Sequence, residues 1–519
     1  MRLARLAEEA GLPLVGPDAD AAQVTGFAID HRKVAPGTVF GAFEGSRFNG
    51  ESFVDAAVAS GAVAVVARPV LPVRGALHIA SDNPRAAFAK LAARFFRPVP
   101  ETIVAVTGTN GKTSTVEMTR QIWRMCGERA ASIGTLGVTT PDGSQATGLT
   151  TPDIVTFLAN MSGLVREGVT HVAYEASSHG LAQHRSEGVP LTAAAFTNFS
   201  RDHLDYHGTM EAYFAAKMRL FSELLQPGTT AVVWDAGDDW SARVVAIVQE
   251  RGCKLLRVGR QDSADLLLAS HEATQLGQQM QVQYAGKTYR LSLPLIGAYQ
   301  ASNALTATAL AIATGSDPAQ VFDAAARLQP VRGRLERAVI TRSGAPVYID
   351  YAHTGDALAA AIEALRPHVT GRLITVFGAG GDRDQGKRQD MGKAAAASDL
   401  VIVTDDNPRG EDPVAIRAEV MRGVTPGVSV REIGDRRAAI AAAVAAARPG
   451  DAVLVAGKGH ETGQDVAGTR HPFDDRAVLR EALRAAGRGG APDTTELARS
   501  CEDTAPPSTG TTSAGEETP

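Results

Sequence analysis

Cysteine is scarce in this chain, with three residues in 519. They are Cys126, Cys253 and Cys501, an odd number of residues that lie far apart in the sequence. This spacing gives no framework of paired cysteines of the kind that stabilises small secreted domains. We therefore predict a protein of a reducing compartment.

Long apolar runs and an excess of one charge are also missing. No apolar run approaches the roughly 20 residues that a membrane-spanning helix requires. The N-terminal sequence MRLARLAEEAGLPL carries acidic side chains where a signal peptide needs an apolar segment. The formal net charge is −5, from 52 Lys and Arg against 57 Asp and Glu, whereas nucleic-acid-binding domains are strongly basic. These absences predict a cytoplasmic protein that neither spans a membrane nor binds nucleic acid.

The segment from Val104 to Ser114 is the most informative feature that is present. An apolar strand leads into a short glycine loop, and a lysine and hydroxyl residues then begin a helix. In such loops backbone N–H groups surround phosphates, the lysine contacts the outer phosphates, and a hydroxyl binds Mg²⁺. A tight turn that contains Gly-Lys-Thr by chance is the alternative. The pattern predicts ATP-type chemistry at Gly108, Thr109, Asn110, Gly111, Lys112, Thr113 and Ser114.

The length of the chain predicts more than one domain. Strand-like and helix-like segments alternate, which is typical of α/β domains with parallel sheets. We predict domains at 1–97, 98–328 and 329–487, followed by a disordered tail at 488–519 that is rich in Gly, Pro, Ser, Thr and Glu. Strands are expected at 103–107, 171–175, 194–198 and 230–234, and again at 347–350, 373–377, 400–404 and 452–456.

Residues suited to metal or phosphate chemistry follow two predicted strands of the second domain. Glu175 lies at the carboxyl end of a strand, where ligands bind in open α/β sheets, and its carboxylate is a natural Mg²⁺ ligand. The alternative for this segment is a helix N-cap. The segment 197–208 contains two Asp, two His and an Arg, which favours a metal or phosphate site. Lys217 lies in the helical stretch 210–225, where spacing alone predicts a solvated lysine.

Four loops stand out in the third domain, at 350–354, 378–388, 405–409 and 457–461. Each follows a predicted strand, so the loops are expected to converge on one edge of a parallel sheet. They combine arginines, which bind carboxylates, with acids, which bind amines. A zwitterionic amino acid is the ligand that this chemistry suits, and glycine-rich turns with surface charges are the alternative.

Together these motifs resemble the Mur ligases over about residues 20–487. The resemblance implies a small α/β domain that binds a UDP group, a central P-loop domain with a parallel sheet that binds ATP, and a C-terminal Rossmann-like domain. The motifs that carry it are TGTNGKT at 107–113, TTPD at 150–153, EASSHGL at 175–181 with QHR at 183–185, SRDHLDYHG at 200–208, DYAHT at 350–354, DNPR at 406–409 and GKGHE at 457–461.

The resemblance also implies a reaction of peptidoglycan precursor synthesis, which supports cell-wall growth, cell shape and division. In this family ATP phosphorylates the D-glutamate γ-carboxylate of UDP-N-acetylmuramoyl-L-alanyl-D-glutamate. The amine of an incoming amino acid then displaces the phosphate and leaves an amide. A carboxylate is a poor electrophile, so the acyl phosphate supplies the leaving group, and Lys112 with Mg²⁺ stabilises the charge on the phosphoryl oxygens. We expect a monomer.

The matching motifs imply which residues form the site. Lys112, Glu175, His203 and Lys217 match catalytic or metal-site residues, and the lysine at position 217 is carbamylated in the family to help hold a second Mg²⁺. The hydroxyl of Thr113 is the loop's own Mg²⁺ ligand. Residues that match nucleotide contacts elsewhere are Asn303, Arg334 and Asp350. Residues that match UDP-dipeptide contacts are His31, Thr150, Thr151, Ser177, Gln183 and Arg185.

The choice of amino acid is implied by the DNPR motif. In relatives that use meso-diaminopimelate, the arginine that matches Arg409 pairs with the distal carboxylate, which lysine lacks. A buried arginine left without a partner is unfavourable, so meso-diaminopimelate is the predicted substrate. The alternatives are the same ligase with L-lysine or L-ornithine, a folylpolyglutamate-synthase-like ligase, and a non-catalytic nucleotide-binding regulator. The rest of the predicted pocket is Arg383, Asp406, Asn407, Pro408, Gly457 and Glu461.

Three positions depart from the family pattern. His31 stands where serine is usual, within a predicted UDP-binding region at 30–32 and 45–50. Gln300 stands where asparagine is common, and is expected to alter a contact on the adenine side. Gly355 stands where proline normally follows DYAHT, and is expected to loosen that loop.

Overall fold

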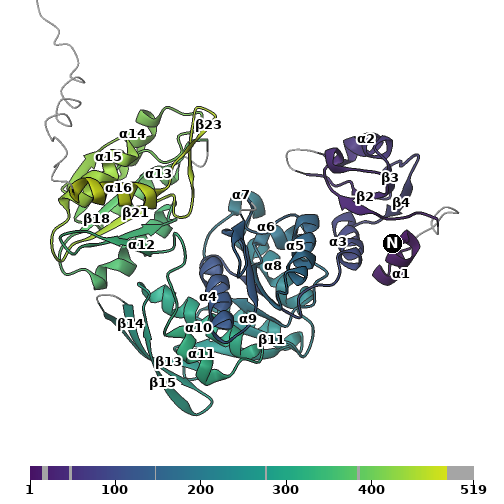
Figure 1. Cartoon of the computed structure of the whole chain (residues 1–519), viewed down its shortest axis with the longest axis horizontal. Helices are drawn as coiled ribbons and strands as arrows, with labels where there is room; N and C mark the ends of the chain where they lie inside the picture. Colours follow the sequence, from purple (N-terminus) through teal and green to yellow (C-terminus); the bar gives the residue numbers. More distant parts are fainter. Residues whose placement is uncertain (14–20, 46–48, 146–147, 275–276, 383–385, 488–519) are drawn as a thin grey trace, which may run out of the picture. The chain divides into compact units, whose positions relative to one another are not determined.

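The computed structural model describes residues 1–13, 21–45, 49–145, 148–274, 277–382 and 386–487 (Figure 1). Contacts divide the chain into two compact units, which are Met1–Leu335 with Glu363–His368, and Glu336–Ile362 with the chain from Val369 onward. The predicted division of the first unit near residue 97 stays a prediction, as does the boundary at 328. The predicted tail lies outside the described residues.

The first unit begins with a parallel sheet of order β1-β2-β3-β4. Helix α3 (Pro84–Phe95) begins where the Asn83 side chain accepts a hydrogen bond from Ala86 N, with proline at its first position. It buries Phe88 and Leu91 in the core. The other elements here are α1 (Leu3–Ala10), β1 (Gly26–Ala28), η1 (His31–Lys33), β2 (Thr38–Gly41), η2 (Gly50–Phe53), α2 (Val54–Ala59), β3 (Ala62–Ala67) and β4 (Leu77–Ala80).

A larger sheet follows, with strand order β15-β14-β13-β12-β11-β10-β5-β9-β6-β7-β8. Strand β5 lies between β10 and β9 and is parallel to both, so the chain leaves β5 where the strand order changes direction. Open α/β sheets bind ligands at this position. The strands are β5 (Thr102–Thr107), β6 (Ala130–Gly134), β7 (Gly137–Thr139), β8 (Ser144–Gln145), β9 (His171–Glu175), β10 (Ala193–Phe196), β11 (Thr230–Asp235), β12 (Lys254–Gly259), β13 (Leu266–Thr274), β14 (Gly277–Tyr284) and β15 (Lys287–Leu293).

Helices cover both faces of this sheet, and β5 shows why. Ile103 and Ala105 belong to one hydrophobic core, whereas Val104 and Val106 belong to another, because successive side chains of a strand point to opposite faces. A strand that is apolar on both sides needs a layer of helices on each. The helices are α4 (Lys112–Met125), α5 (Ile154–Arg166), α6 (Ser178–Ala182), α7 (Leu204–His207), α8 (Met210–Arg219), α9 (Asp239–Glu250), α10 (Ala298–Ala313) and α11 (Pro318–Ala325).

Two features of the first unit differ from the sequence-based expectation. The strands β13, β14 and β15 form an antiparallel extension that was not predicted. The helical stretch expected at 210–225 changes its winding, since α8 ends at Arg219 and a π-helical turn, η3 (Leu220–Leu224), follows. Such turns are rare, and they are frequently found at functional sites.

The second unit contains a sheet of order β16-β17-β21-β18-β19-β20, in which only β16 is antiparallel to its neighbour. The carboxyl ends of the parallel strands therefore share one edge, as the sequence predicted. The strands are β16 (Glu336–Ile340), β17 (Pro346–Asp350), β18 (Leu373–Phe377), β19 (Leu400–Val403), β20 (Val430–Glu432) and β21 (Ala452–Ala456), with a hairpin of β22 (Gly463–Val466) and β23 (Thr469–Pro472). The helices are α12 (Gly355–Leu365), α13 (Lys387–Ala395), α14 (Pro413–Gly423), α15 (Arg436–Ala446) and α16 (Asp475–Gly487).

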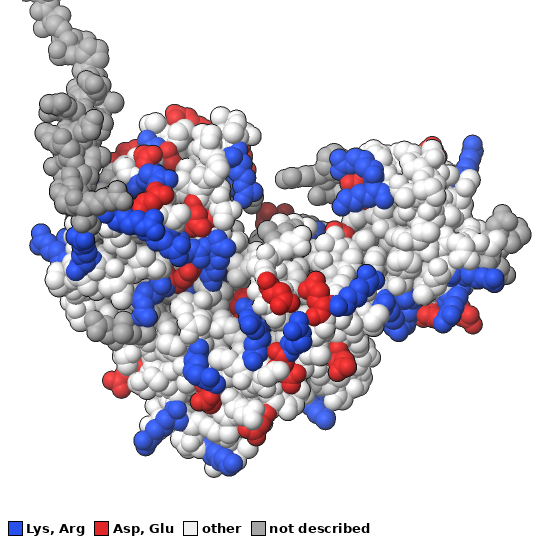
Figure 2. All heavy atoms as spheres, in the orientation of Figure 1, with Lys and Arg blue, Asp and Glu red and all other residues white. Residues whose placement is uncertain are grey.

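The surface carries charges of both signs. Figure 2 shows Lys and Arg side chains interspersed with Asp and Glu on the face in view. Within the described ranges, no helix is both long enough and apolar enough to cross a bilayer.

Candidate active site

The glycine loop between β5 and α4 is held in shape by the end of the neighbouring strand. Gly108 has φ +148°, and a Cβ there would lie 2.0 Å from Thr197 Oγ1, so only glycine fits. The backbone N–H of Thr109 donates to Asn198 O at 2.9 Å, and that of Asn110 donates to Asn198 Oδ1 at 2.9 Å. These contacts preform the loop before the first turn of α4, a position at which backbone N–H groups commonly bind anions.

Two lysine side chains meet at the carbonyl oxygen of Gly108. Lys112 Nζ donates to it at 2.9 Å and Lys217 Nζ at 2.7 Å, although the two residues lie far apart in the sequence. Burial lowers the pKa of Lys112, and burial together with the charge of Lys112 lowers the pKa of Lys217 well below its usual value. The side chain of Lys217 is 1% exposed, so the expectation of a solvated lysine from spacing alone is wrong.

Glu175 is buried at the end of β9 and is held by hydroxyl and amide groups. Its Oε1 accepts from Thr135 N at 2.6 Å, and its Oε2 accepts from Thr113 Oγ1 at 3.0 Å and from Thr135 Oγ1 at 3.3 Å. Burial raises the pKa of Glu175, and the nearby charge of Lys112 opposes this effect. A carboxylate beside a threonine hydroxyl is a set of hard oxygen donors that fits Mg²⁺.

Thr135 was missed by sequence reasoning. It directly follows β6, which pairs with β9 in parallel, so the carboxyl-end rule that pointed to Glu175 applies to it as well. Its Oγ1 also lies within hydrogen-bond distance of Thr150 Oγ1, at 3.2 Å, which links the acid to a residue predicted to contact the UDP-dipeptide.

Other predicted nucleotide residues lie against the same loop. Arg334 donates from NH2 to Thr113 Oγ1 at 3.3 Å. A Cβ on Gly111 would lie 2.3 Å from Asn303 Oδ1, which places that amide on the loop, and Ser114 is buried in the first turn of α4. Gln300, which departs from the family pattern, bonds to two of these residues. Its side chain accepts from Asn303 Nδ2 at 3.1 Å and donates to Arg334 O at 3.1 Å.

His203 lies at the start of α7 with a left-handed backbone, φ +51°. Burial lowers the pKa of His203, Asp202 opposes the shift, and the charges of Lys112 and Lys217 lower it further. Among the described residues, no three His, Cys, Asp or Glu side chains are grouped closely enough to hold a metal by themselves. The remaining ligands of any cation here would come from hydroxyls, a carbamate or the substrate.

Four of the residues predicted to contact the UDP-dipeptide form one hydrogen-bonded network, namely Thr151, Ser177, Gln183 and Arg185. Thr151 Oγ1 donates to Glu175 O at 2.7 Å and lies 3.0 Å from Ser177 Oγ, which also caps α6. Arg185 donates to Thr151 O at 3.2 Å and to Gln183 Oε1 at 2.7 Å. This network is therefore bonded to the backbone of Glu175, whose carboxylate lies beside the phosphate loop.

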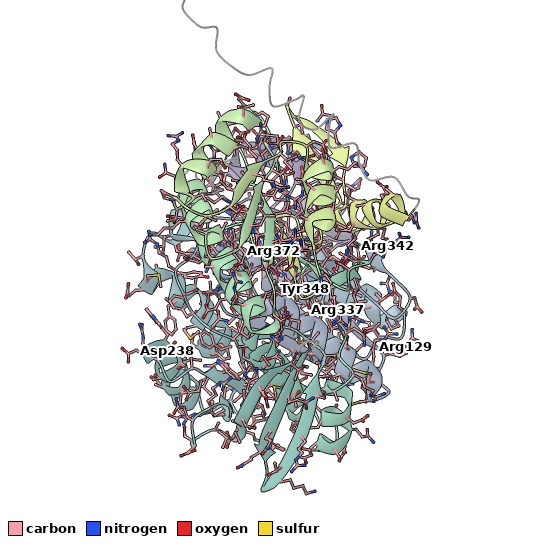
Figure 3. All side chains as sticks on the ribbon, turned by 90° about the vertical axis from the view of Figure 1, so that its left-hand side faces the viewer. Arg129, Asp238, Arg337, Arg342, Tyr348 and Arg372 are labelled. Carbon is pink, nitrogen blue, oxygen red and sulfur yellow. The ribbon has the colours of Figure 1, made fainter. Side chains whose placement is uncertain are left out.

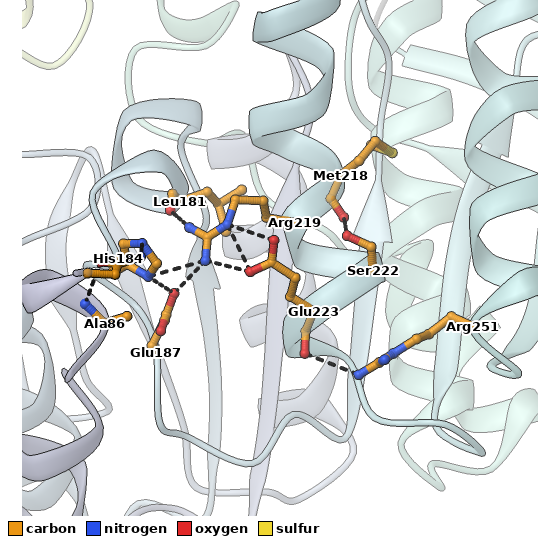
Figure 4. A network of polar contacts seen from close by, with 10 residues as sticks. Ala86, Leu181, His184, Glu187, Met218, Arg219, Ser222, Glu223 and Arg251 are labelled. Atoms are coloured by element: carbon orange, nitrogen blue, oxygen red, sulfur yellow. Dashed lines mark hydrogen bonds and ion pairs between the residues drawn. The ribbon is translucent and has the colours of Figure 1, made fainter. Parts of the chain in front are cut away.

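Arg219, two residues after Lys217, contacts α6 and the residues that follow this helix (Figure 4). Its guanidinium donates to the carbonyl of Leu181 in α6 and to Glu187 Oε1 at 2.8 Å, and it lies 3.2 Å from His184 Nδ1. It also donates to Glu223 in the π-helical turn at 2.7 Å. The helix that carries Lys217 is thus bonded to the helix that Ser177 caps.

In the second unit, the predicted amino-acid pocket is a network around the DNPR and GKGHE motifs. Asn407 Nδ2 donates to Glu461 Oε2 at 3.0 Å, and Lys458 Nζ lies 3.3 Å from Asp406 Oδ1. Arg409, with φ +51°, donates from NH1 to Gly381 O at 2.7 Å, and it is partly rather than fully buried. Pro408 is buried between these residues. Arg383 lies outside the described residues.

The loop after β17 joins the same edge of the sheet. The backbone N–H of Gly457 donates to Asp350 O at 3.1 Å, and Asp350 Oδ1 accepts from Ala352 N at 2.8 Å. Gly355 begins α12 where a Cβ would lie 2.9 Å from Asp390 Cβ, so a larger side chain would clash. The loosening expected from this glycine is therefore offset by close packing.

The third departure, His31, has a ring partner. Its imidazole stacks on Phe53 with centroids 4.3 Å apart and planes 2° apart. Asp30 accepts from the Arg32 backbone and side chain, which fixes the short helix η1. The histidine therefore takes part in a stacked pair at the predicted UDP-binding region.

The fold and the site define a phosphate-binding α/β protein with a P-loop-like glycine turn, a buried lysine and an acid at the adjacent strand. The family model described as the Mur ligase middle domain matches residues 106–311. The model described as the Mur ligase glutamate ligase domain matches residues 333–459.

Known proteins match over nearly the whole chain. The UDP-N-acetylmuramoyl-L-alanyl-D-glutamate–2,6-diaminopimelate ligase of Zymomonas mobilis is 56% identical over 465 residues, which is 89% of this chain and 95% of the relative. The ligase of the same name from Bradyrhizobium diazoefficiens is 50% identical, over 90% of this chain and 96% of the relative. A solved structure of a ligase of that name is 33% identical with a TM-score of 0.71, over 94% of this chain and 99% of the other.

The chain belongs to the Mur ligase family. The predicted family, the α/β class and the ligase activity class are confirmed by these matches.

Proposed function

We propose that this chain is an ATP-dependent ligase that joins meso-diaminopimelate to UDP-N-acetylmuramoyl-L-alanyl-D-glutamate in cytoplasmic peptidoglycan precursor synthesis, acting as a monomer. The observation that carries the proposal is the convergence of Lys112 and Lys217 on the phosphate loop, beside Glu175 and Thr113. The names of the relatives at 56% and 50% identity support the choice of substrates.

The first half of the reaction makes an acyl phosphate. The γ-carboxylate of the dipeptide attacks the γ-phosphorus of ATP, the bond to the β,γ-bridging oxygen breaks, and ADP leaves. Lys112 and the loop N–H groups stabilise the negative charge on the transferred group. Thr113, Glu175, His203 and the carbamate of Lys217 are the groups that would hold Mg²⁺. When bound, this ion neutralises phosphate charge as a Lewis acid.

The environment of Lys217 supports its carbamylation. The reaction requires a neutral amine, which attacks CO₂ to give a carbamate and a proton, and the pKa of Lys217 is lowered well below its usual value. The product is an anion next to the charge of Lys112, so the modification replaces a neutral amine with a group that attracts this charge.

The second half of the reaction forms the amide. The neutral amine of the amino acid attacks the acyl carbon, loses a proton, and the tetrahedral intermediate expels inorganic phosphate. Arg409 supplies a guanidinium for a carboxylate, and Glu461 and Asp406 supply negative charge for an ammonium group. The predicted roles of Arg383, Gly457, Asn303 and Asp350 remain part of this proposal.

A phosphate-release assay tests the proposal. The enzyme, ATP and the UDP-dipeptide are combined in turn with meso-diaminopimelate, L-lysine and L-ornithine. We expect turnover with meso-diaminopimelate and at least about 10-fold lower kcat/KM with the other two, since they lack the second carboxylate that Arg409 is proposed to bind. Faster turnover with L-lysine would assign the chain to the lysine-adding ligases, and no turnover with any of the three would refute the proposal.

A further inference from the structure

Lys458 is a charged residue of the second unit that the predicted pocket does not include. It follows β21, inside the GKGHE motif, and its side chain is 0% exposed. Its ammonium donates to Asn407 Oδ1 at 2.9 Å and to Gly463 O at 2.9 Å. It also forms ion pairs with Asp406 at 3.3 Å and with Glu461 at 3.6 Å. The residue therefore contacts both motifs at once.

Lys458 determines which way the amide of Asn407 faces. Asn407 Oδ1 accepts from Lys458 Nζ and from the backbone N–H of Asp465 at 3.0 Å. Both partners are donors only, so the amide oxygen must face them and the NH₂ group must point away. That group donates to Glu461 Oε2 at 3.0 Å, and the position of the Glu461 carboxylate is thereby set through Asn407.

The charges of this cluster do not cancel. One ammonium lies between two carboxylates, of which the Asp406 side chain is 8% exposed and the Glu461 side chain is 30% exposed. Lys458 is closer to Asp406, so the excess negative charge falls on the more accessible Glu461. A carboxylate held in this way is suited to an ammonium group brought in by a ligand.

We propose that Lys458 is a specificity-determining positioning residue, which fixes Asn407 and Glu461 so that they bind an ammonium group of the incoming amino acid. The proposal rests on the proposed function for the identity of that amino acid. Its new element is that affinity for the amino acid depends on a buried lysine that lies behind the carboxylate.

The test is the variant Lys458→Met, assayed for phosphate release in the full-length enzyme. We expect KM for meso-diaminopimelate to rise about 10-fold or more, because two hydrogen bonds to a charged group are lost. KM for ATP and for the UDP-dipeptide should stay within about twofold, since the partners given for the Lys458 ammonium include none of the residues predicted to bind them. A purely structural role would lower the amount of active enzyme and leave all three KM values unchanged.

Arg372→Met is the matched control. Arg372 is labelled in Figure 3 and donates to Asp451 at 2.7 Å. It directly precedes β18, so it lies at the opposite edge of the sheet from the loops, and its loss should leave all three KM values unchanged. If Lys458→Met does not fold, Lys458→Gln, which keeps an N–H donor, is judged by the same criteria.

A double-mutant cycle with Glu461→Gln completes the test. If Lys458 acts through Glu461, the two substitutions together should raise KM little more than one alone. Full additivity, or an unchanged KM in Lys458→Met, would overturn the inference. Failure of the wild-type enzyme to use meso-diaminopimelate would instead count against the proposed function.

Discussion

The two candidate sites hold their lysine side chains in opposite ways. At the phosphate loop of the first unit, Lys112 and Lys217 donate to carbonyl oxygens, and among the described residues neither forms an ion pair. In the second unit, Lys458 lies between Asp406 and Glu461, and Arg436 pairs with Asp475 through two hydrogen bonds of 2.8 and 2.7 Å.

This difference indicates what each site is built to receive. Cations that are desolvated without a counter-charge have lowered pKa values, and an incoming phosphate or carbamate would supply the missing negative charge. Charges that are already paired are stable without a ligand and serve to orient one another. We infer that the first unit provides electrostatic stabilisation, whereas the second provides selection by shape and orientation.

Lys112→Met should have the largest effect on activity. We expect kcat to fall about 100- to 1,000-fold, because the group that stabilises the transferred phosphoryl oxygens is lost. The midpoint of thermal unfolding should change little, since the loss of a desolvated charge without an ion-pair partner is offset by the loss of its attraction to Glu175. Phosphate release and thermal unfolding measure the two effects, and a large loss of stability would contradict the comparison.

Loss of the carbamate on Lys217 should have the next largest effect on activity. Incubation with ¹³C-bicarbonate should give a carbamate signal in the wild-type enzyme and none in Lys217→Arg. The arginine variant keeps a positive charge but cannot form the carbamate, so we expect kcat to fall about 100-fold. Removal of CO₂ should lower the activity of the wild-type enzyme reversibly. An arginine variant with full activity would show that the carbamate is not needed.

Arg409→Ala tests the second unit. We expect kcat/KM for meso-diaminopimelate to fall about 10- to 100-fold, because the partner of one carboxylate is removed. The ratio of kcat/KM for meso-diaminopimelate to that for L-lysine should fall toward one. Stability should change little, since Arg409 is partly exposed and donates to a backbone carbonyl. Unchanged kinetics with both amino acids would remove the basis for the substrate assignment.

Much of the fold could be predicted from the sequence because its signals are local. The expected strands at 171–175, 373–377 and 452–456 match β9, β18 and β21, since a short apolar run between turn residues is typical of a buried strand. The carboxyl-end rule located Glu175 and the four loops of the second unit for the same reason.

What the sequence did not predict depends on contacts between distant segments. Lys217 is buried because its helix packs on the phosphate loop, and no local pattern records that contact. The π-helical turn after Arg219 contains no glycine or proline from which it could be predicted. Lys458 lies within a motif that was singled out, but its role depends on Asn407, which is 51 residues away in the chain.

Replacement of Arg219 is expected to have the smallest effect on catalysis. It tests the contrast between paired and unpaired cations within the first unit. Unlike Lys112, Arg219 is paired with acids, and the side chain of Glu187 that it contacts is only 10% exposed. Arg219→Met would leave this carboxylate without a full charge partner, so we expect a loss of about 2 kcal/mol in the free energy of unfolding. Arg219→Lys, which keeps one charge, should lose less.

Because Arg219 also bonds to Leu181, between Ser177 and Gln183, KM for the UDP-dipeptide should rise about threefold to tenfold in Arg219→Met, with a smaller change in KM for ATP. Chemical denaturation and initial-rate kinetics on the same preparations measure both effects. Lys112→Met and Arg219→Met should thus show opposite patterns, the first losing activity without stability and the second losing stability with modest loss of activity. If both variants were destabilised equally, the distinction between unpaired catalytic cations and paired structural ones would not hold.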